Sequence, residues 1–137
     1  MAGARYRFVF SGVRSAGKPL QLQEIVLRSS SGALLLPQAV TNPLGSSPPS
    51  QQVVDLFDQN LEAPSSKWLD LNFPLALNST VEITLRPGSP APASYELFTA
   101  NDNPGRDPTA WEFARLAETG WEVLDRQQGV RPPSERL

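Results

Sequence analysis

Apolar and polar residues alternate in several short stretches of this chain, and a period of two residues predicts β-strands. In residues 6–10 the aromatic side chains fall on one face, while Arg7 and Val9 fall on the other. Comparable patterns occur in residues 20–27, 68–73, 81–85, 95–99 and 121–124. Turn-forming residues separate these stretches, so the pattern predicts roughly six or seven short strands and an all-β sandwich.

The segments between the predicted strands contain most of the prolines and many of the glycines and serines. Residues 41–50 and 86–93 are predicted loops, the second in an extended, polyproline-like conformation. Residues 51–60 are predicted to hold one turn of helix. Within residues 20–27 the phase of the alternation shifts around Glu24, which indicates a bulge or a special role for that carboxylate.

Residues 108–119 satisfy the rules for two different elements. Asp107 is a suitable helix N-cap, the proline after it suits the first helical position, and Gly120 suits a helix stop. Intrinsic propensity therefore favours a helix. The same residues also alternate, with Trp111 and Phe113 on one face, which favours a strand.

The composition is that of an ordinary globular domain. A length of 137 residues predicts one domain with a core of its own. Fourteen prolines against nine glycines favour short strands joined by ordered loops over a helical bundle. The net charge of −2, from twelve basic and fourteen acidic residues, gives no bulk attraction to nucleic acid. No segment approaches the roughly twenty apolar residues that span a bilayer, so no transmembrane segment is expected.

Cysteine and histidine are both absent from the chain. Their absence excludes disulfides, thiolate metal sites, thiol nucleophiles and imidazole bases. Without a nucleophile elbow or a phosphate-binding loop either, the sequence favours a protein that is not an enzyme. Residues 1–5 lack the apolar core of a signal peptide, so the compartment stays open between an intracellular protein and a secreted one whose leader has been removed.

Two dense groups of motifs and one separate motif carry a family resemblance. The first group consists of Asp58, Asn60, Ser66, Lys67 and Trp68. The second group consists of Tyr95, Leu97, Thr99-Ala100-Asn101-Asp102, Arg106-Asp107-Pro108 and Trp111, and a Trp-x-x-Leu-Asp motif follows at residues 121–125. An apolar-Gln-Leu-x-Glu-Ile-x-Leu motif occupies residues 20–27. Together these motifs resemble the galactose-binding-like family, also known as discoidin or coagulation-factor C-type domains.

The resemblance implies a jelly-roll β-sandwich that covers residues 6–130, with an N-terminal extension at 1–5 and a C-terminal tail at 131–137. In the family the motif found here at 20–27 usually closes the domain, so the strand order is expected to be permuted. First and last strands of such a sandwich are neighbours, and a permutation of this kind preserves the packing. The resemblance also implies a strand at residues 108–119.

In many members of the family a structural calcium ion lies under the loops. The matching positions in this chain are Asp58, Asn60, Ser66 and Glu24. Calcium takes six to eight hard oxygen ligands, which carboxylates, hydroxyls and carbonyls supply. The alternative is that Asp58 and Glu24 only accept hydrogen bonds from loop backbone.

The family binds sugars and surfaces through its loops, which points to a set of ligand-binding residues. These residues are Arg106, Asp107, Asn101, Asp102 and Phe57. Planar guanidinium and carboxylate groups bind vicinal hydroxyls well. The alternative is a loop that is held by its own salt bridge and by Asx-turns. The three tryptophans are expected in the core.

Two functions follow as hypotheses. In the first, the protein is a non-catalytic module that recognises a carbohydrate, as a glycan or glycoprotein, through its loops. In the second, it is a structural subunit that docks onto a larger protein assembly through the sandwich and its proline-rich loops, because pre-extended segments lose little entropy on docking.

Overall fold

The computed structural model describes residues 3–61, 63 and 66–133. Parts of the predicted extension (1–5) and of the predicted tail (131–137) therefore lie outside the described residues. Within the described chain every strand pairing is antiparallel, and helices are short. The prediction of an all-β fold is confirmed.

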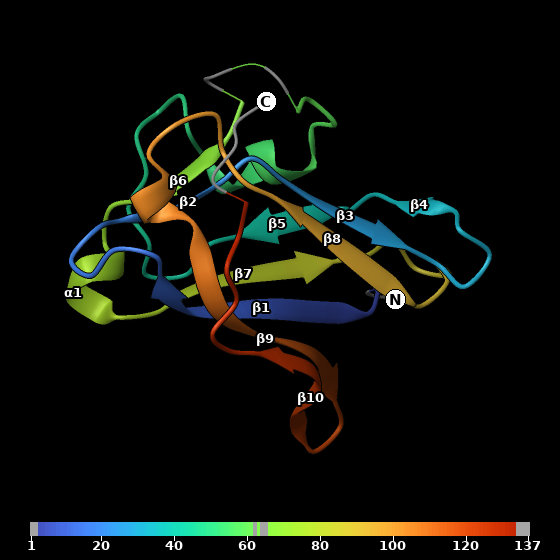
Figure 1. Cartoon of the computed structure of the whole chain (residues 1–137). Helices are drawn as coiled ribbons and strands as arrows, with labels where there is room; N and C mark the ends of the chain where they lie inside the picture. Colours follow the sequence, from blue (N-terminus) through green and yellow to red (C-terminus); the bar gives the residue numbers. More distant parts are fainter. Residues whose placement is uncertain (1–2, 62, 64–65, 134–137) are drawn as a thin grey trace.

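The strands form two layers, with β3 and β8 above β1 and β7 in Figure 1. The larger sheet has the order β10 (Gly120–Gln127), β9 (Pro108–Ala117), β1 (Arg5–Val13), β7 (Ser79–Thr84) and β5 (Ala39–Thr41). The other layer contains a sheet of β4 (Leu34–Leu35), β3 (Glu24–Arg28) and β8 (Ser94–Phe98), and a pair of β2 (Leu20–Leu22) and β6 (Trp68–Asp70). Short helices η1 (Val53–Phe57), α1 (Phe73–Ala76) and η2 (Pro104–Arg106) lie in the connections.

The core fills the space between the layers, and its side chains follow the alternation of the sequence. On β1 the residues Tyr6, Phe8 and Phe10 are buried. The ring of Phe8 meets the ring of Tyr95 from β8 edge-to-face, with centroids 5.0 Å apart. Burying a side chain of this size stabilises the fold by about 1.5–3 kcal/mol, so these contacts hold the two layers together.

Residues 108–117 form the strand β9 and not a helix. β9 pairs with β1 on one side and with β10 on the other. Its residue Phe113 is 4% exposed and packs on the ring of Phe8. Hydrogen bonds to a neighbouring strand on each edge of β9 and the burial of Phe113 outweigh the local helix signals, because tertiary context overrides weak propensities.

The predicted strand at 20–27 is two strands in different sheets. β2 pairs with β6, whereas β3 pairs with β4 and β8. The chain changes partners at Gln23, so the shift of phase near Glu24 marks this crossing between sheets. The short β5 has no signal in the alternation and was not predicted.

The predicted strand at 68–73 is too long. β6 ends at Asp70, whose Oδ1 accepts a hydrogen bond of 2.9 Å from the backbone N–H of Asn72. α1 then begins at Phe73 with Pro74 in its first turn, where a proline is favoured because no backbone donor is needed. The predicted helical turn within 51–60 is confirmed as η1.

Candidate functional site

A groove opens along the flank of the molecule where the two layers meet. β8 is an edge strand of one sheet and β10 is an edge strand of the other. The groove between them and β9 has a volume of about 670 Å³. Its described lining consists of Pro92, Ala93, Ser94, Tyr95, Leu97, Trp111, Phe113, Leu124, Asp125 and Gln127.

Each of the three strands presents residues two positions apart to this groove, as the period of a strand requires. β8 contributes Tyr95 and Leu97, β9 contributes Trp111 and Phe113, and β10 contributes Asp125 and Gln127. The pairing of β10 with β9 shifts register between Val123 and Asp125, which indicates a bulge. The bulge accounts for the presence of the consecutive residues Leu124 and Asp125 in one groove.

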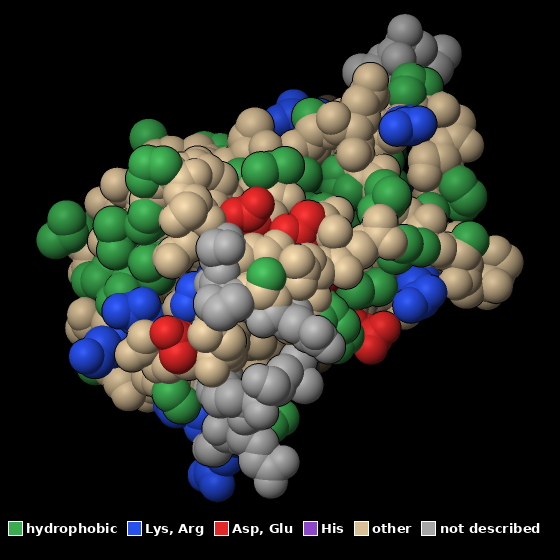
Figure 2. Space-filling view, turned by 90° about the horizontal axis from the view of Figure 1, so that it is seen from above, with side chains coloured by type: hydrophobic (Ala, Val, Ile, Leu, Met, Phe, Trp, Pro, Cys, Tyr) green, Lys and Arg blue, Asp and Glu red, His purple; other side chains and the backbone are tan. Residues whose placement is uncertain are grey.

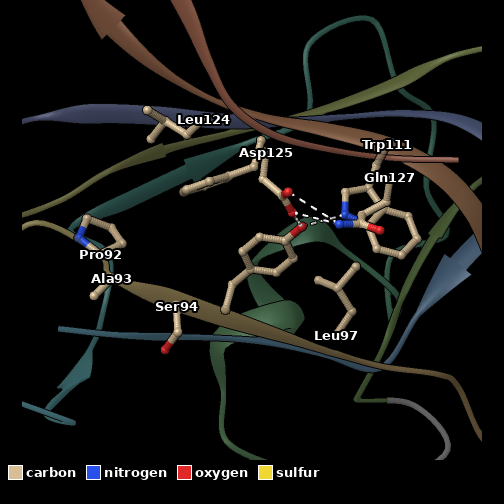
Figure 3. Close-up of a pocket in the computed structure, with 10 residues that line it drawn as sticks. Pro92, Ala93, Ser94, Leu97, Trp111, Leu124, Asp125 and Gln127 are labelled. Atoms are coloured by element: carbon tan, nitrogen blue, oxygen red, sulfur yellow. Dashed lines mark hydrogen bonds between the residues drawn. The ribbon is translucent and has the colours of Figure 1, made fainter. Parts of the chain in front are cut away.

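A chain of hydrogen bonds runs across the groove (Figure 3). The indole Nε1–H of Trp111 donates to the hydroxyl of Tyr95 at 2.9 Å, and that hydroxyl donates to Oδ2 of Asp125. The Gln127 amide lies 3.3 Å from each carboxylate oxygen of Asp125. Burial, together with the bond to Asp125, raises the pKa of Tyr95 to about 12, so its hydroxyl remains a donor at any physiological pH.

The groove therefore combines aromatic surface with a small set of fixed polar groups. Asp125 is the only charged side chain in its described lining. No ion pair found within the described chain includes Asp125. Since a carboxylate has about four lone-pair positions, Asp125 keeps capacity for donors from a ligand.

A second constellation forms at the crossing between β2 and β3. The Glu24 side chain is buried, and its Oε2 accepts a hydrogen bond of 2.8 Å from the backbone N–H of Gln59. Its Oε1 is buried, and the Glu24 carboxyl group also shares a side-chain hydrogen bond with Asp58. Burial raises the pKa of Glu24 to about 8 against the opposing effect of the Gln59 bond, and the nearby carboxylate of Asp58 raises it further.

The neighbours of Glu24 are the residues that the family resemblance implies. Asp58 accepts hydrogen bonds from the backbone N–H of Asn60 at 2.9 Å and from the hydroxyl of Ser66. The structure thus brings Glu24, Asp58, Asn60 and Ser66 into one cluster. No group of three or more acidic side chains suited to a metal is present in the described ranges.

Backbone carbonyls add oxygen atoms to this cluster. The side-chain amide of Gln23 is the donor to the carbonyl oxygens of Asn60 at 3.0 Å, Ala63 at 3.2 Å and Ser66 at 2.9 Å. An amide has two hydrogens for these three acceptors. Together with the carboxyl groups of Glu24 and Asp58, these carbonyls form an oxygen-rich set of the kind that calcium prefers.

The predicted ligand residues Asn101 and Asp102 are held by the protein itself. The Lys67 side chain is buried, and its ammonium group donates to Asn101 Oδ1 at 3.1 Å and to Asp102 Oδ1 at 2.8 Å. The hydrogen bond from Lys67 lowers the pKa of Asp102. The Gln21 amide also donates to the backbone carbonyl of Asp102 at 2.6 Å.

Of the predicted pair Arg106 and Asp107, the structure holds Asp107 within the scaffold. Asp107 is fully buried and pairs with Arg14 at 3.1 Å, so the salt bridge that holds this loop comes from the end of β1 and not from Arg106. Arg106 lies in η2 and is partly buried. Phe57 lines a separate small cavity of about 150 Å³ with Glu24 and Leu61.

The tryptophans have three different surroundings. Trp68 is fully buried, as predicted. Trp111 is half-buried and packs on the core from the groove. Trp121 is half-buried and outside the core, so the prediction is wrong for it; it lies under the guanidinium of Arg7, 4.4 Å from its ring centroid, in a cation–π contact.

Four exposed leucines gather at the α1 end of the molecule, and we call this surface the leucine end. Its members are Leu44, Leu71, Leu75 and Leu77. Leu44 is 92% exposed and Leu75 is 85% exposed. The side chain of Asn72 donates to the Leu44 carbonyl at 2.8 Å, which joins the two segments. Figure 2 shows apolar side chains gathered at its left, which is the α1 end of Figure 1.

Sequence reasoning missed the groove, although each of its strands was predicted. Tyr95 and Asp125 are 30 residues apart and meet only because the edges of two sheets come together. The available signal was the polar pair Asp125 and Gln127, two positions apart and just beyond the predicted strand at 121–124. No helix of the described chain is long and apolar enough to cross a membrane. Comparison with protein-family models, with curated proteins and with solved structures finds no match to this chain.

Proposed function

We propose that this protein is a non-catalytic binding module that holds a carbohydrate in the groove between β8 and β9–β10. The observation that carries the proposal is the joint presence of Trp111, Tyr95, Asp125 and Gln127 in one open groove. An aromatic side chain offers surface to the C–H face of a sugar ring. A carboxylate and an amide bind its hydroxyls at defined positions.

The groove suits this role better than the loop predicted from the sequence. Asp102 and Asp107 direct their carboxylates at Lys67 and Arg14, so their negative charge is balanced within the scaffold. Asp125 is bound only by neutral donors, Tyr95 and Gln127, among the described contacts. A ligand therefore gains more from the carboxylate of Asp125 than from those of the loop.

We also propose that the fold is a permuted galactose-binding-like jelly-roll sandwich. Two observations support it: the antiparallel layers around one core, and the pairing of the first strand β1 with the late strand β9. When first and last strands are neighbours, the chain can begin at a different strand without loss of packing.

Calcium is proposed as a structural ion of the loop beside β3. Glu24 and Asp58 would supply carboxylate oxygens, and Asn60, Ala63 and Ser66 would supply carbonyls. Bound calcium would place positive charge beside the neighbouring carboxylates of Glu24 and Asp58 and reduce the repulsion between them. Its role here is to stabilise the loop, because the cluster and the groove share no lining residue among those described.

The test is binding of the purified protein to an array of neutral and charged glycans. We expect selective binding that the substitution Gln127→Ala weakens about tenfold, because one or two hydrogen bonds to the ligand are lost. Glu118→Gln, in the exposed β9–β10 turn, serves as the control and keeps full binding. Binding that depends on Arg106 and not on Gln127 would move the site to the loop. If the folded protein binds no glycan on the array, carbohydrate recognition is refuted.

A second function, that of a docking subunit in a protein assembly, is favoured by the leucine end. Contiguous exposed apolar residues on a folded protein mark interaction sites, whereas single ones are common. Cross-linking in cells that naturally make the protein, with a photoreactive group in place of Leu75, distinguishes docking from glycan binding alone. Cross-links to one defined protein support docking. If no cross-links form and glycan binding is intact, docking is refuted and only the function of a binding module remains.

A further inference from the structure

The charged groups of the described groove lining are of one sign, negative. The described lining contains one carboxylate, Asp125, and no lysine or arginine. The adjacent guanidinium of Arg126 does not neutralise Asp125, because it pairs with Glu112 at 2.8 Å. Tyr95 and Gln127 offer Asp125 only neutral hydrogen bonds. The groove is thus a place of negative potential within a lining that is mostly apolar.

Aromatic rings lie beside the carboxylate and supply much of the apolar surface of the groove. Trp111 and Tyr95 both line the groove and are joined to Asp125 through the Tyr95 hydroxyl. Because the Tyr95 hydroxyl oxygen and the Trp111 N–H lie in the planes of their rings, Asp125 faces the ring edges and not the ring faces. An ammonium group near Asp125 would therefore gain a charge-assisted hydrogen bond, and the rings would contact the apolar part of the same ligand.

From these features we infer that the groove selects carbohydrates that carry a free amino group, such as β-1,4-linked glucosamine oligomers. The inference rests on the proposed function and names the ligand class of that same groove. The pyranose ring covers the apolar lining, and its ammonium group donates to the carboxylate of Asp125. Sugars with carboxylate groups are disfavoured, because Asp125 would face a like charge with no basic residue in the described lining to offset it.

Three oligosaccharides of equal length and linkage test the inference: a glucosamine oligomer, its N-acetylated counterpart and a cellulose oligomer. They differ only in the group at carbon 2 of each ring, which in weakly acidic buffer is ammonium, acetamido or hydroxyl. By titration calorimetry at low salt we expect the glucosamine oligomer to bind roughly fivefold to tenfold more tightly than the others, as for a partly desolvated ion pair. Raising the salt concentration reduces the difference.

The variant Asp125→Asn keeps the shape of the side chain and removes its charge. We expect it to bind the three oligomers equally, whereas the control Glu118→Gln, which removes one charge outside the groove, keeps the preference. Equal binding of all three oligomers by the native protein overturns the inference and leaves carbohydrate binding in place. A preference that persists in Asp125→Asn overturns it as well, because the charge that selects would lie elsewhere.

Two further outcomes separate the inference from the function beneath it. Binding of none of the three oligomers or of any array glycan refutes the proposed function, and the inference falls with it. An oligolysine peptide serves as a final arm at the same charge as the glucosamine oligomer. Binding of the peptide through Asp125, without binding of the oligosaccharides, would assign the groove to a basic peptide and overturn the choice of a sugar.

Discussion

Glu24 is a carboxyl group whose burial makes the folded protein sensitive to pH. Its pKa is about 8 in the folded protein, against an ordinary value of 4.5. Between these values the folded state binds a proton that the unfolded chain has released. The stability linked to Glu24 is therefore complete below about pH 4.5 and is lost as the pH rises toward 8.

We expect the midpoint temperature of thermal unfolding, measured in the presence of chelator, to decrease as the pH rises from 5 to 8, because Glu24 must ionise. Glu24→Gln imitates the protonated group and should remove this part of the slope. Differential scanning calorimetry across the pH range measures both proteins. A slope that Glu24→Gln leaves unchanged would show that other groups cause it.

Calcium should act most strongly where Glu24 is ionised. We expect millimolar calcium to raise the unfolding temperature at pH 8 more than at pH 5, because protons compete for the carboxylates. Magnesium at the same concentration is the control, since its smaller octahedral site suits a set of loop carbonyls less well. No effect of calcium at pH 8 would remove the metal from the proposal and leave the pH slope in place.

Tyr95 links Trp111 to Asp125 and is the central residue of the groove. Tyr95→Phe leaves the indole N–H and the carboxylate without their shared partner, at a cost of about 1–2 kcal/mol in unfolding free energy. Urea denaturation monitored by tryptophan fluorescence measures the loss. A stability equal to that of the native protein would mean that water replaces the hydroxyl without penalty.

At the scale of elements, Arg14 fastens three segments at the end of β1. It donates to the carbonyls of Pro104 at 3.0 Å and Pro132 at 2.6 Å, and it pairs with the buried Asp107. We expect Arg14→Ala to cost about 3 kcal/mol of unfolding free energy, because a buried carboxylate loses its cation. The matched control is Arg5→Ala, whose pair with Glu82 is exposed, and its cost should stay below about 0.5 kcal/mol. Chemical denaturation compares the two, and equal costs would contradict the role given to Arg14.

Alternation in the sequence predicted the strands wherever one face of a strand is buried. It could not predict which strands pair, so residues 20–27 were expected as one strand although Gln23 divides them between two sheets. Local rules also left 108–117 open, since the pairing of β9 with both β1 and β10 is tertiary. Boundaries failed where a turn residue such as Asp70 stops a strand through its side chain.

The candidate sites, like the strands, could be predicted only in part. Glu24, Asp58, Asn60 and Ser66 were expected together from a family resemblance, and hydrogen bonds and charge interactions do join them. The groove depends on the separation between two sheet edges, which no local pattern encodes. Arg106 and Asp107 looked available in the sequence because the cation that binds Asp107 is remote in the chain.

At the scale of the whole molecule, the leucine end should control association with other surfaces. We expect the double variant Leu44→Ser, Leu75→Ser to remain in solution at higher ammonium sulfate concentration than the native protein. Its urea midpoint should not fall, since both side chains are already exposed in the folded state. A precipitation point equal to that of the native protein would show that these leucines contribute no cohesive surface.

The pairing of β1 with β9 also governs when the protein can acquire its structure during synthesis. Tyr6 lies opposite Arg115, so the centre of the larger sheet joins two ends of the chain. The ribosome releases β1 long before β8 and β9 exist, so the aromatic face of β1 stays exposed until the opposite layer has been made. Sheets built from such distant contacts form slowly, and their unpaired strands are prone to aggregate in the meantime. The nascent chain is therefore expected to need a chaperone until β8 and β9 have emerged.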